Sequence, residues 1–262
     1  MHVARKRFGQ HFLHDPGIIR RIVAAVDPQP EDLLVEIGPG LGAITFPLLE
    51  RVRQMHAIEI DRDAIRYLRS HPDTEDRLSI HEADILQFDL ASLRQDEQRL
   101  RVVGNLPYNI STPLLFRLIE QREHILDLHV MLQKEVVQRM AARAGSAHYG
   151  RLSVMLAPWM SVEPLFDIGP GAFRPPPKVS STFARLVPIA SCPWLEHPRE
   201  YGMVVAAAFA QRRKTLRNSL RALLTEQEIA HAGLDAGARA ETIAPLGYAA
   251  LARELARKRA RA

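Results

Sequence analysis

The chain has very little cysteine and no apolar run long enough to span a membrane. Cys192 is the single cysteine among 262 residues, which excludes internal disulfides and any cysteine-based zinc cluster. A membrane-spanning helix needs about 20 consecutive apolar residues, and no segment approaches that length. His11 and His14 have no apparent third ligand. We therefore expect a cytoplasmic protein with no metal site and no membrane association.

Residues 1–187 alternate short apolar runs with helix-like segments, a rhythm typical of an α/β fold with a parallel, doubly wound sheet. The predicted strands are 33–37, 55–60, 78–81, 100–103, 126–132, 162–168 and 181–187, and the predicted helices are 43–53, 62–70, 113–122 and 134–142. Three consecutive prolines make 169–178 a stiff, exposed excursion. After residue 188 the pattern is helical, at 198–211, 215–224, 226–232 and 245–259. We expect two domains, 1–190 and 191–262.

The positive charge of the chain is concentrated at its carboxyl-terminal end. Residues 188–262 hold 12 lysines and arginines against 7 acids, which accounts for the entire net charge of +5. A segregated basic surface is typical of a protein that binds a polyanion such as nucleic acid. A solvated helix face is the alternative that charge alone leaves open.

Asn105-Leu106-Pro107-Tyr108 directly follow one predicted strand. An adenine N6 amine is a poor nucleophile, because its lone pair is delocalised into the ring. The Asn105 side-chain carbonyl and the Leu106 main-chain carbonyl can accept its two N–H bonds, Pro107 fixes the backbone, and Tyr108 offers a stacking face. The alternative is a strand end followed by a proline turn with a half-buried tyrosine.

Groups suited to an adenosyl cofactor follow the three preceding strands. Gly38 and Gly40 lie in a G-x-G-x-G turn, which alone fits either NAD or S-adenosylmethionine. Glu59 closes the next strand, where a carboxylate can bind ribose hydroxyls. Asp84 follows the third strand, where it can accept a hydrogen bond from an adenine amino group. Together with Asn105, these positions favour S-adenosylmethionine and an amine acceptor.

The chain resembles the bacterial small-subunit ribosomal RNA adenine dimethyltransferases. The segments that carry the resemblance are 6–13 (KRFGQHFL), 36–42 (EIGPGLG), Asp84, 105–111 (NLPYNIS), 173–179 (FRPPPKV) and 212–217 (RRKTLR). The resemblance implies a class I S-adenosylmethionine-dependent methyltransferase fold, Rossmann-like with a mostly parallel seven-stranded sheet and a small helical carboxyl-terminal domain. It also implies dimethylation of N6 of two adjacent adenosines in the 3′-terminal hairpin loop of 16S rRNA, in an immature 30S subunit. We expect the protein to be a monomer.

The resemblance assigns site residues by position. It places cofactor contacts at His11, Leu13, Gly38, Gly40, Glu59, Asp84 and Asn105, and catalytic residues at Asn105, Leu106, Pro107 and Tyr108. The family motif usually has asparagine where this chain has His11. Phe173 can provide a second stacking face opposite Tyr108, although a hydrophobic plug under the loop is an equal alternative.

The carboxyl-terminal domain carries the expected contacts to RNA. They are Arg212, Arg213, Lys214, Arg217 and Arg221. Arg213, Arg217 and Arg221 recur at every fourth position, which predicts a phosphate-binding stripe on one helix face.

Three other functions remain open. A macrolide-resistance methyltransferase would use the same catalytic layout on an adenine of 23S rRNA. A DNA adenine-N6 methyltransferase usually carries proline where this chain has Leu106. The chain could also act mainly as a ribosome-assembly binding factor.

Overall fold

The computed structural model describes residues 11–74, 76–94, 96–211 and 213–261. The described chain divides into two compact units. The first runs to Val137 and includes Val162–Pro188, and the second contains Gln138–Ser161 and the residues from Ile189 onward. Gln138–Ser161 belongs with the second unit because Tyr149 and Val154 are buried in its core. Independent domains at 1–190 and 191–262 stay a prediction.

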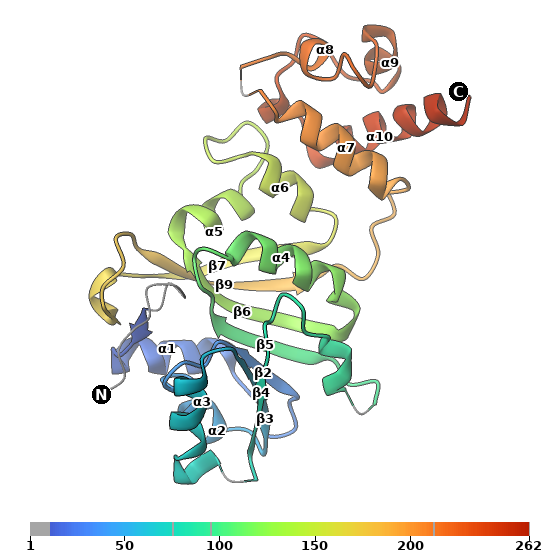
Figure 1. Ribbon diagram of the computed structural model, residues 1–262. Helices are drawn as coiled ribbons and strands as arrows, with labels where there is room; N and C mark the ends of the chain where they lie inside the picture. Colours follow the sequence, from blue (N-terminus) through green and yellow to red (C-terminus); the bar gives the residue numbers. More distant parts are fainter. Residues whose placement is uncertain (1–10, 75, 95, 212, 262) are drawn as a thin grey trace. The chain divides into compact units, whose positions relative to one another are not determined.

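A seven-stranded sheet forms the first unit (Figure 1). Its order is β4-β3-β2-β5-β6-β9-β7, with β2 at Leu34–Ile37, β3 at Met55–Glu59, β4 at Leu78–Glu82, β5 at Leu100–Asn105, β6 at Ile125–Gln133, β7 at Met160–Ile168 and β9 at Ser181–Pro188. The neighbours from β4 through β6 are parallel, and β9 is antiparallel to β6. The predicted mostly parallel, seven-stranded sheet is therefore confirmed.

The strand order reverses between β2 and β5, which in open α/β sheets marks where a ligand crevice forms. All residues of β2 are buried, the three apolar ones and Glu36 alike, as expected for a strand that is covered on both faces. The two strands approach closely at Gly104, where a Cβ atom would lie 2.6 Å from the Ile37 carbonyl oxygen. Glycine at this position therefore lets β5 run beside β2 up to Asn105.

Among the described residues of the first unit, five α-helices begin. They are α1 at Pro16–Val26, α2 at Thr45–Leu49, α3 at Arg62–Arg69, α4 at Ser111–Glu120 and α5 at Lys134–Met140, which ends in the second unit. We predicted no element at α1, although Asp15 caps it by accepting from Gly17 and Ile18, and Pro16 occupies its first position. The predicted helix 43–53 is wrong in extent, because the glycine-rich turn continues to Ile44 before α2 begins.

A small two-stranded ribbon joins two parts of the first unit that are distant in sequence. β1 at Phe12–Leu13 runs antiparallel to β8 at Phe173–Arg174, with Leu13 opposite Phe173. The prediction that 169–178 is an exposed excursion is therefore wrong at its centre, because Ala172 and Phe173 are buried.

The second unit is helical, with α6 at Arg151–Leu156, α7 at Pro198–Ala208, α8 at Leu216–Ser219, α9 at Glu226–His231 and α10 at Pro245–Ala260. Its core contains two buried tyrosines whose hydroxyls are both bonded: Tyr201 donates to the Val154 carbonyl and Tyr248 to the Ala240 carbonyl. Helix α8 is shorter than the predicted helix 215–224. None of the helices in the described ranges has the length and apolar character needed to cross a membrane.

Candidate active site

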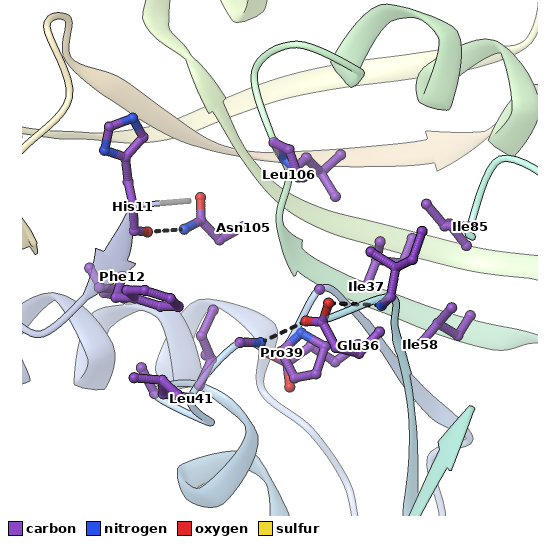
Figure 2. Close-up of a pocket in the computed structure, with 18 of the residues that line it drawn as sticks. His11, Phe12, Glu36, Ile37, Pro39, Leu41, Ile58, Ile85, Asn105 and Leu106 are labelled. Atoms are coloured by element: carbon purple, nitrogen blue, oxygen red, sulfur yellow. Dashed lines mark hydrogen bonds between the residues drawn. The ribbon is translucent and has the colours of Figure 1, made fainter. Parts of the chain in front are cut away.

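A cavity of about 600 Å³ lies where β2, β3 and β5 end (Figure 2). Its wall includes the predicted residues His11, Leu13, Gly38, Gly40, Glu59, Asp84, Asn105, Leu106, Pro107 and Tyr108. A volume of this size is typical of small-molecule and cofactor sites. The fold therefore brings these ten positions together, and their individual roles stay predictions.

The glycine turn after β2 needs a conformation that other residues rarely adopt. Gly38 has φ +67° and Gly40 has φ +57°, in the left-handed region. A Cβ atom on Gly40 would lie 3.2 Å from the Phe12 ring. The turn thus keeps the backbone close to β1 while leaving room in the cavity.

The Glu59 carboxylate, at the end of β3, is fixed by main-chain amides. Its Oε1 accepts from the N–H groups of Ile60 and Asp61, each at 2.8 Å, and its Oε2 accepts from Gly40 N–H at 3.2 Å. The pKa of Glu59 is raised, because burial raises it by more than these hydrogen bonds lower it. A carboxylate has about four acceptor sites, so this group can still accept from a ligand hydroxyl.

The next part of the wall combines one carboxylate with apolar side chains. Asp84 Oδ1 accepts from Leu86 N–H at 3.0 Å. Ile60 and Ile85 line the same cavity, and Ile60 is 48% exposed, which is unusual for a large apolar residue. We did not predict either isoleucine as a site residue. The available signal was an isoleucine placed directly after the strand-end Glu59.

Asn105 has a defined amide orientation. Its Nδ2 donates to the His11 main-chain oxygen at 3.0 Å (Figure 2). A carbonyl can only accept, so the NH₂ group must face His11, and Oδ1 is left for a donor in the cavity. Leu106 N–H donates to Met131 O at 3.1 Å, and no donor within the described residues reaches the Leu106 carbonyl. The site therefore offers two neighbouring acceptors.

The Tyr108 ring is held from two sides. Its hydroxyl lies 2.6 Å from the Ser181 hydroxyl, and its ring centroid lies 5.7 Å from that of His11. His11 Nδ1 lies 2.8 Å from the Pro175 carbonyl oxygen, so this nitrogen must carry the proton it donates. His11, which departs from the family motif, thus connects β1, the loop after β8 and Tyr108.

Phe173 does not form a second stacking face in this structure. It is 3% exposed and belongs to the hydrophobic core that also contains Leu13, Ile168 and Phe183. Its pairing with Leu13 turns this residue inward, whereas its neighbours Arg174 and Pro175 line the cavity. The alternative interpretation, a hydrophobic plug under the loop, agrees with this burial.

The predicted RNA contacts lie in the second unit. Arg212 is outside the described residues, and Arg213, Lys214, Arg217 and Arg221 are exposed. The expectation of one helical stripe is wrong, because Arg213 precedes Thr215, only Arg217 lies in α8, and Arg221 follows it in a turn.

Sequence reasoning missed Arg239, which lies beside this basic segment. Thr215 forms an isolated antiparallel bridge with Arg239, and Leu216 N–H donates to Ala238 O at 2.9 Å. Arg239 is exposed. The pairing joins segments that are more than twenty residues apart, so no local pattern could have indicated it.

Glu36 is a buried acid in the cavity wall. It is 1% exposed, and its Oε2 accepts from the Thr45 hydroxyl at 2.6 Å. Burial, which outweighs the Thr45 hydrogen bond, raises the pKa of Glu36 to about 7.

We predict that Glu36 makes stability depend on pH. The folded chain binds the Glu36 proton more tightly than the unfolded chain, so its contribution is fully present below pH 4.5 and is lost as the pH rises to about 7. Glu36→Gln removes the titration. The free energy of unfolding of the variant minus that of the wild type should therefore increase by about 3 kcal/mol as the pH rises from 4.5 to about 7. Urea denaturation at several pH values measures it, and a pH-independent difference would contradict the prediction.

Within the described residues, no three His, Cys, Asp or Glu side chains form a group that could hold a metal ion. The polar groups of the cavity instead suit an organic ligand: carboxylates at Glu59 and Asp84, and amide acceptors at Asn105 and Leu106.

Known proteins share both the sequence and the fold. Residues 1–257 match the family model described as ribosomal RNA adenine dimethylase. The chain is 55% identical to ribosomal RNA small subunit methyltransferase A of Methylococcus capsulatus, over 97% of this chain and 98% of the relative. It is 53% identical to the protein of that name from Methylobacillus flagellatus, over 97% and 99%.

Two solved structures share the fold of this chain. A dimethyladenosine transferase from Plasmodium falciparum superposes with a TM-score of 0.78 at 25% identity, covering 95% of this chain and 98% of that one. The 23S rRNA methyltransferase ErmE gives a TM-score of 0.68 at 26% identity, covering 94% and 99%. The class I methyltransferase fold is therefore confirmed, and with a family match over nearly the full length the chain belongs to the ribosomal RNA adenine dimethylase family.

Proposed function

We propose that this chain transfers methyl groups from S-adenosylmethionine to N6 of two adjacent adenosines in the 3′-terminal hairpin loop of small-subunit rRNA, and dimethylates both. It would act as a monomer on the immature subunit, late in assembly. The observation that carries the proposal is the orientation of Asn105, whose Nδ2 is bonded to His11 O and whose Oδ1 is therefore available to an amine.

The cavity fits S-adenosylmethionine, which supplies an electrophilic methyl group when bound. Glu59 would accept from the ribose hydroxyls, since its carboxylate is already fixed by three main-chain amides. Asp84 would accept from the adenine amino group, and Ile60 would cover the face of that ring. His11, Leu13, Gly38 and Gly40 would complete the contacts.

The chain's own residues then orient the acceptor. Extruding the target adenine from an RNA loop costs less free energy than extruding it from a duplex, and the extruded ring would stack on Tyr108. Asn105 Oδ1 and the Leu106 carbonyl would accept the two N6–H bonds and direct the nitrogen lone pair at the methyl group. Orientation of this kind can supply most of a rate enhancement. The proton of the alkylated amine can pass to water, so no dedicated base is needed.

Methylation of 23S rRNA is the second candidate, because the fold also superposes on ErmE. The test is transfer of radiolabelled methyl groups to naked 16S rRNA, 23S rRNA, DNA and unmethylated small subunits. We expect label in the small subunits. Label in 23S rRNA alone would overturn the proposal in favour of the second candidate, and no label in any substrate would favour a role in assembly alone.

We also propose that the exposed segment around α8 binds rRNA phosphates, a role that Arg239 can share. Arg213, Lys214 and Arg221 make no ion pair within the described residues. The cations of α10 differ, since Arg257 pairs with Glu254 at 2.7 Å and Lys258 with Glu228 at 3.0 Å. Neutralised cations attract phosphates less, so binding should depend mainly on the α8 segment.

Combined Arg213→Ala and Lys214→Ala substitution should weaken binding to small subunits and make it less sensitive to salt. The slope of log affinity against log salt should fall by about 0.7 for each cation removed. Arg257→Ala with Lys258→Ala removes the same charge from α10 and should change the slope much less. Equal slopes for the two double variants, measured by filter binding, would contradict the proposal.

A further inference from the structure

The loop that carries Tyr108 has a fixed backbone. Leu106 N–H donates to Met131 O, Ile110 N–H donates to Pro107 O at 3.2 Å, and the Ser111 hydroxyl donates to Tyr108 O at 3.1 Å. These bonds place the Cα atom of Tyr108 at the cavity wall. They leave its two side-chain torsions free, so another contact must fix the far end of the side chain.

That contact comes from β9. The Tyr108 and Ser181 hydroxyls lie 2.6 Å apart and share a hydrogen bond. Ser181 has no exposed surface, and it lies opposite Gln133 in the antiparallel ladder of β9 with β6. A serine held in this way cannot follow the Tyr108 hydroxyl if the side chain swings to another χ1 rotamer. The bond therefore fixes the far end of the Tyr108 side chain to the sheet.

We propose that Ser181 is a positioning residue for the acceptor base, because its hydroxyl holds the far end of the Tyr108 side chain and so keeps the ring at the place where that base stacks. This inference rests on the proposed function. A ring that is already ordered loses no further freedom when a base stacks on it, so the complex forms more readily. The His11 ring, with its centroid 5.7 Å away, limits rotation of the Tyr108 ring on one side.

The neighbouring Thr182 provides a matched control. It is also buried on β9, and its hydroxyl forms a hydrogen bond of the same length, 2.6 Å, with Asp167 Oδ1. Thr182 does not line the cavity. Thr182→Val therefore removes a comparable bond from the same strand without releasing Tyr108.

The experiment is a double-mutant cycle of Ser181→Ala and Tyr108→Phe, assayed by methyl transfer to unmethylated small subunits. Each single variant should lower kcat/KM for RNA by about 5- to 10-fold, on the scale of ordering one side chain. The double variant should be no worse than either single variant, because both remove the same bond. Thr182→Val should keep the wild-type value.

Two further measurements separate positioning from general damage to the fold. The dissociation constant for S-adenosylhomocysteine should stay unchanged in all variants. A loop RNA with 2-aminopurine at the target position should lose fluorescence on binding to the wild type, as the base stacks, and lose less with Ser181→Ala. Multiplying effects in the double variant, or an equal loss in Thr182→Val, would overturn the inference. An inactive wild type would instead overturn the proposed function.

Discussion

Alanine at position 105 is expected to lower kcat by about 10²–10³-fold, the scale on which one positioned polar group acts at a reacting centre. The substitution removes the oxygen that would accept an N6–H bond and leaves the Leu106 carbonyl as the remaining acceptor. Binding to small subunits should be retained, since the predicted phosphate contacts lie elsewhere. Steady-state methyl transfer and a separate binding assay measure the two effects. A rate within a few-fold of wild type would contradict the role of Asn105.

Asn105→Asp tests the orientation of the amide. This variant keeps an acceptor oxygen but loses the donor to His11 O. A carboxylate oxygen would take the place of Nδ2, which lies 3.0 Å from the His11 main-chain oxygen. Repulsion should turn the side chain away, so the rate should fall well below wild type. A rate near wild type would show that the bond to His11 O does not set the geometry.

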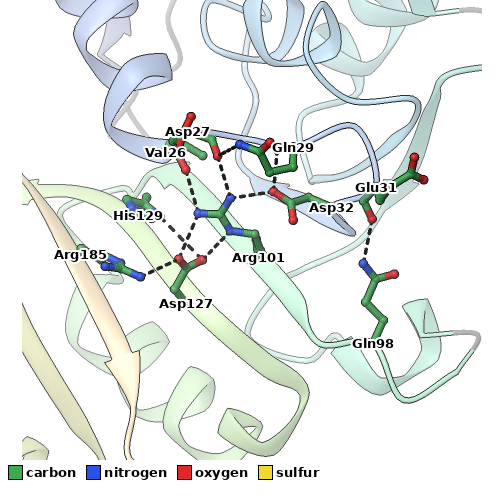
Figure 3. A network of polar contacts seen from close by, with 10 residues as sticks. All are labelled: Val26, Asp27, Gln29, Glu31, Asp32, Gln98, Arg101, Asp127, His129 and Arg185. Carbon is green, nitrogen blue, oxygen red and sulfur yellow. Dashed lines mark hydrogen bonds and ion pairs between the residues drawn. The ribbon is translucent and has the colours of Figure 1, made fainter.

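Asp127→Ala is expected to cause the largest loss of stability, about 3 kcal/mol, the lower end of the range for breaking a buried ion pair. Asp127 is 2% exposed, and its two oxygens accept from Arg101 Nε and Nη2, each at 3.0 Å (Figure 3). Arg185 approaches the same carboxylate at 3.4 Å. Removing the acid leaves the Arg101 guanidinium, whose side chain is 12% exposed, with fewer partners, and the more exposed Arg185 loses a partner as well.

The lower end of the range for a broken buried ion pair applies because Arg101 keeps other partners when Asp127 is removed. Its Nη1 donates to Asp32 Oδ2 at 2.7 Å, and its Nη2 donates to the Val26 carbonyl at the end of α1 (Figure 3). Glu31→Ala is the control: its pair with Arg53 is about 70% exposed on both sides and contributes about 0–1 kcal/mol. Urea denaturation compares the two variants.

The position of this network allows its effect on stability to be distinguished from an effect on ligand binding. Arg101 and Asp127 lie near the amino-terminal ends of β5 and β6, whereas Asn105 ends β5 at the cavity. Asp127→Ala should therefore lower stability without changing the affinity for S-adenosylhomocysteine. Equal stability losses for Asp127→Ala and Glu31→Ala would contradict the account of the network.

The sheet and several polar groups of the cavity wall could be predicted because their signals are local. Strands β2 and β5 are short, mostly apolar runs, and the polar groups Glu59, Asp84 and Asn105 each stand at or just after a strand end. Parallel strands bring these ends to one edge, so positions along the chain translate directly into positions in space.

Features that depend on pairing distant segments could not be predicted. For Phe173, beside three prolines, we predicted presentation to a ligand with burial under the loop as an equal alternative, and its pairing with Leu13, some 160 residues earlier, buries it. The contact of Ser181 with Tyr108 likewise depends on the register of β9 against β6. No local sequence pattern near Phe173 or Ser181 indicates the distant segment with which it pairs.

The most direct test is mass spectrometry of the rRNA oligonucleotides that a nuclease releases from unmethylated small subunits incubated with the protein and S-adenosylmethionine. The account predicts N6,N6-dimethyladenosine at two adjacent positions of the 3′-terminal hairpin loop, formed about 10²–10³-fold more slowly when the Asn105→Ala variant is used. Dimethyladenosine elsewhere in the rRNA, or its formation by the Asn105→Ala variant at the wild-type rate, would contradict the central claim.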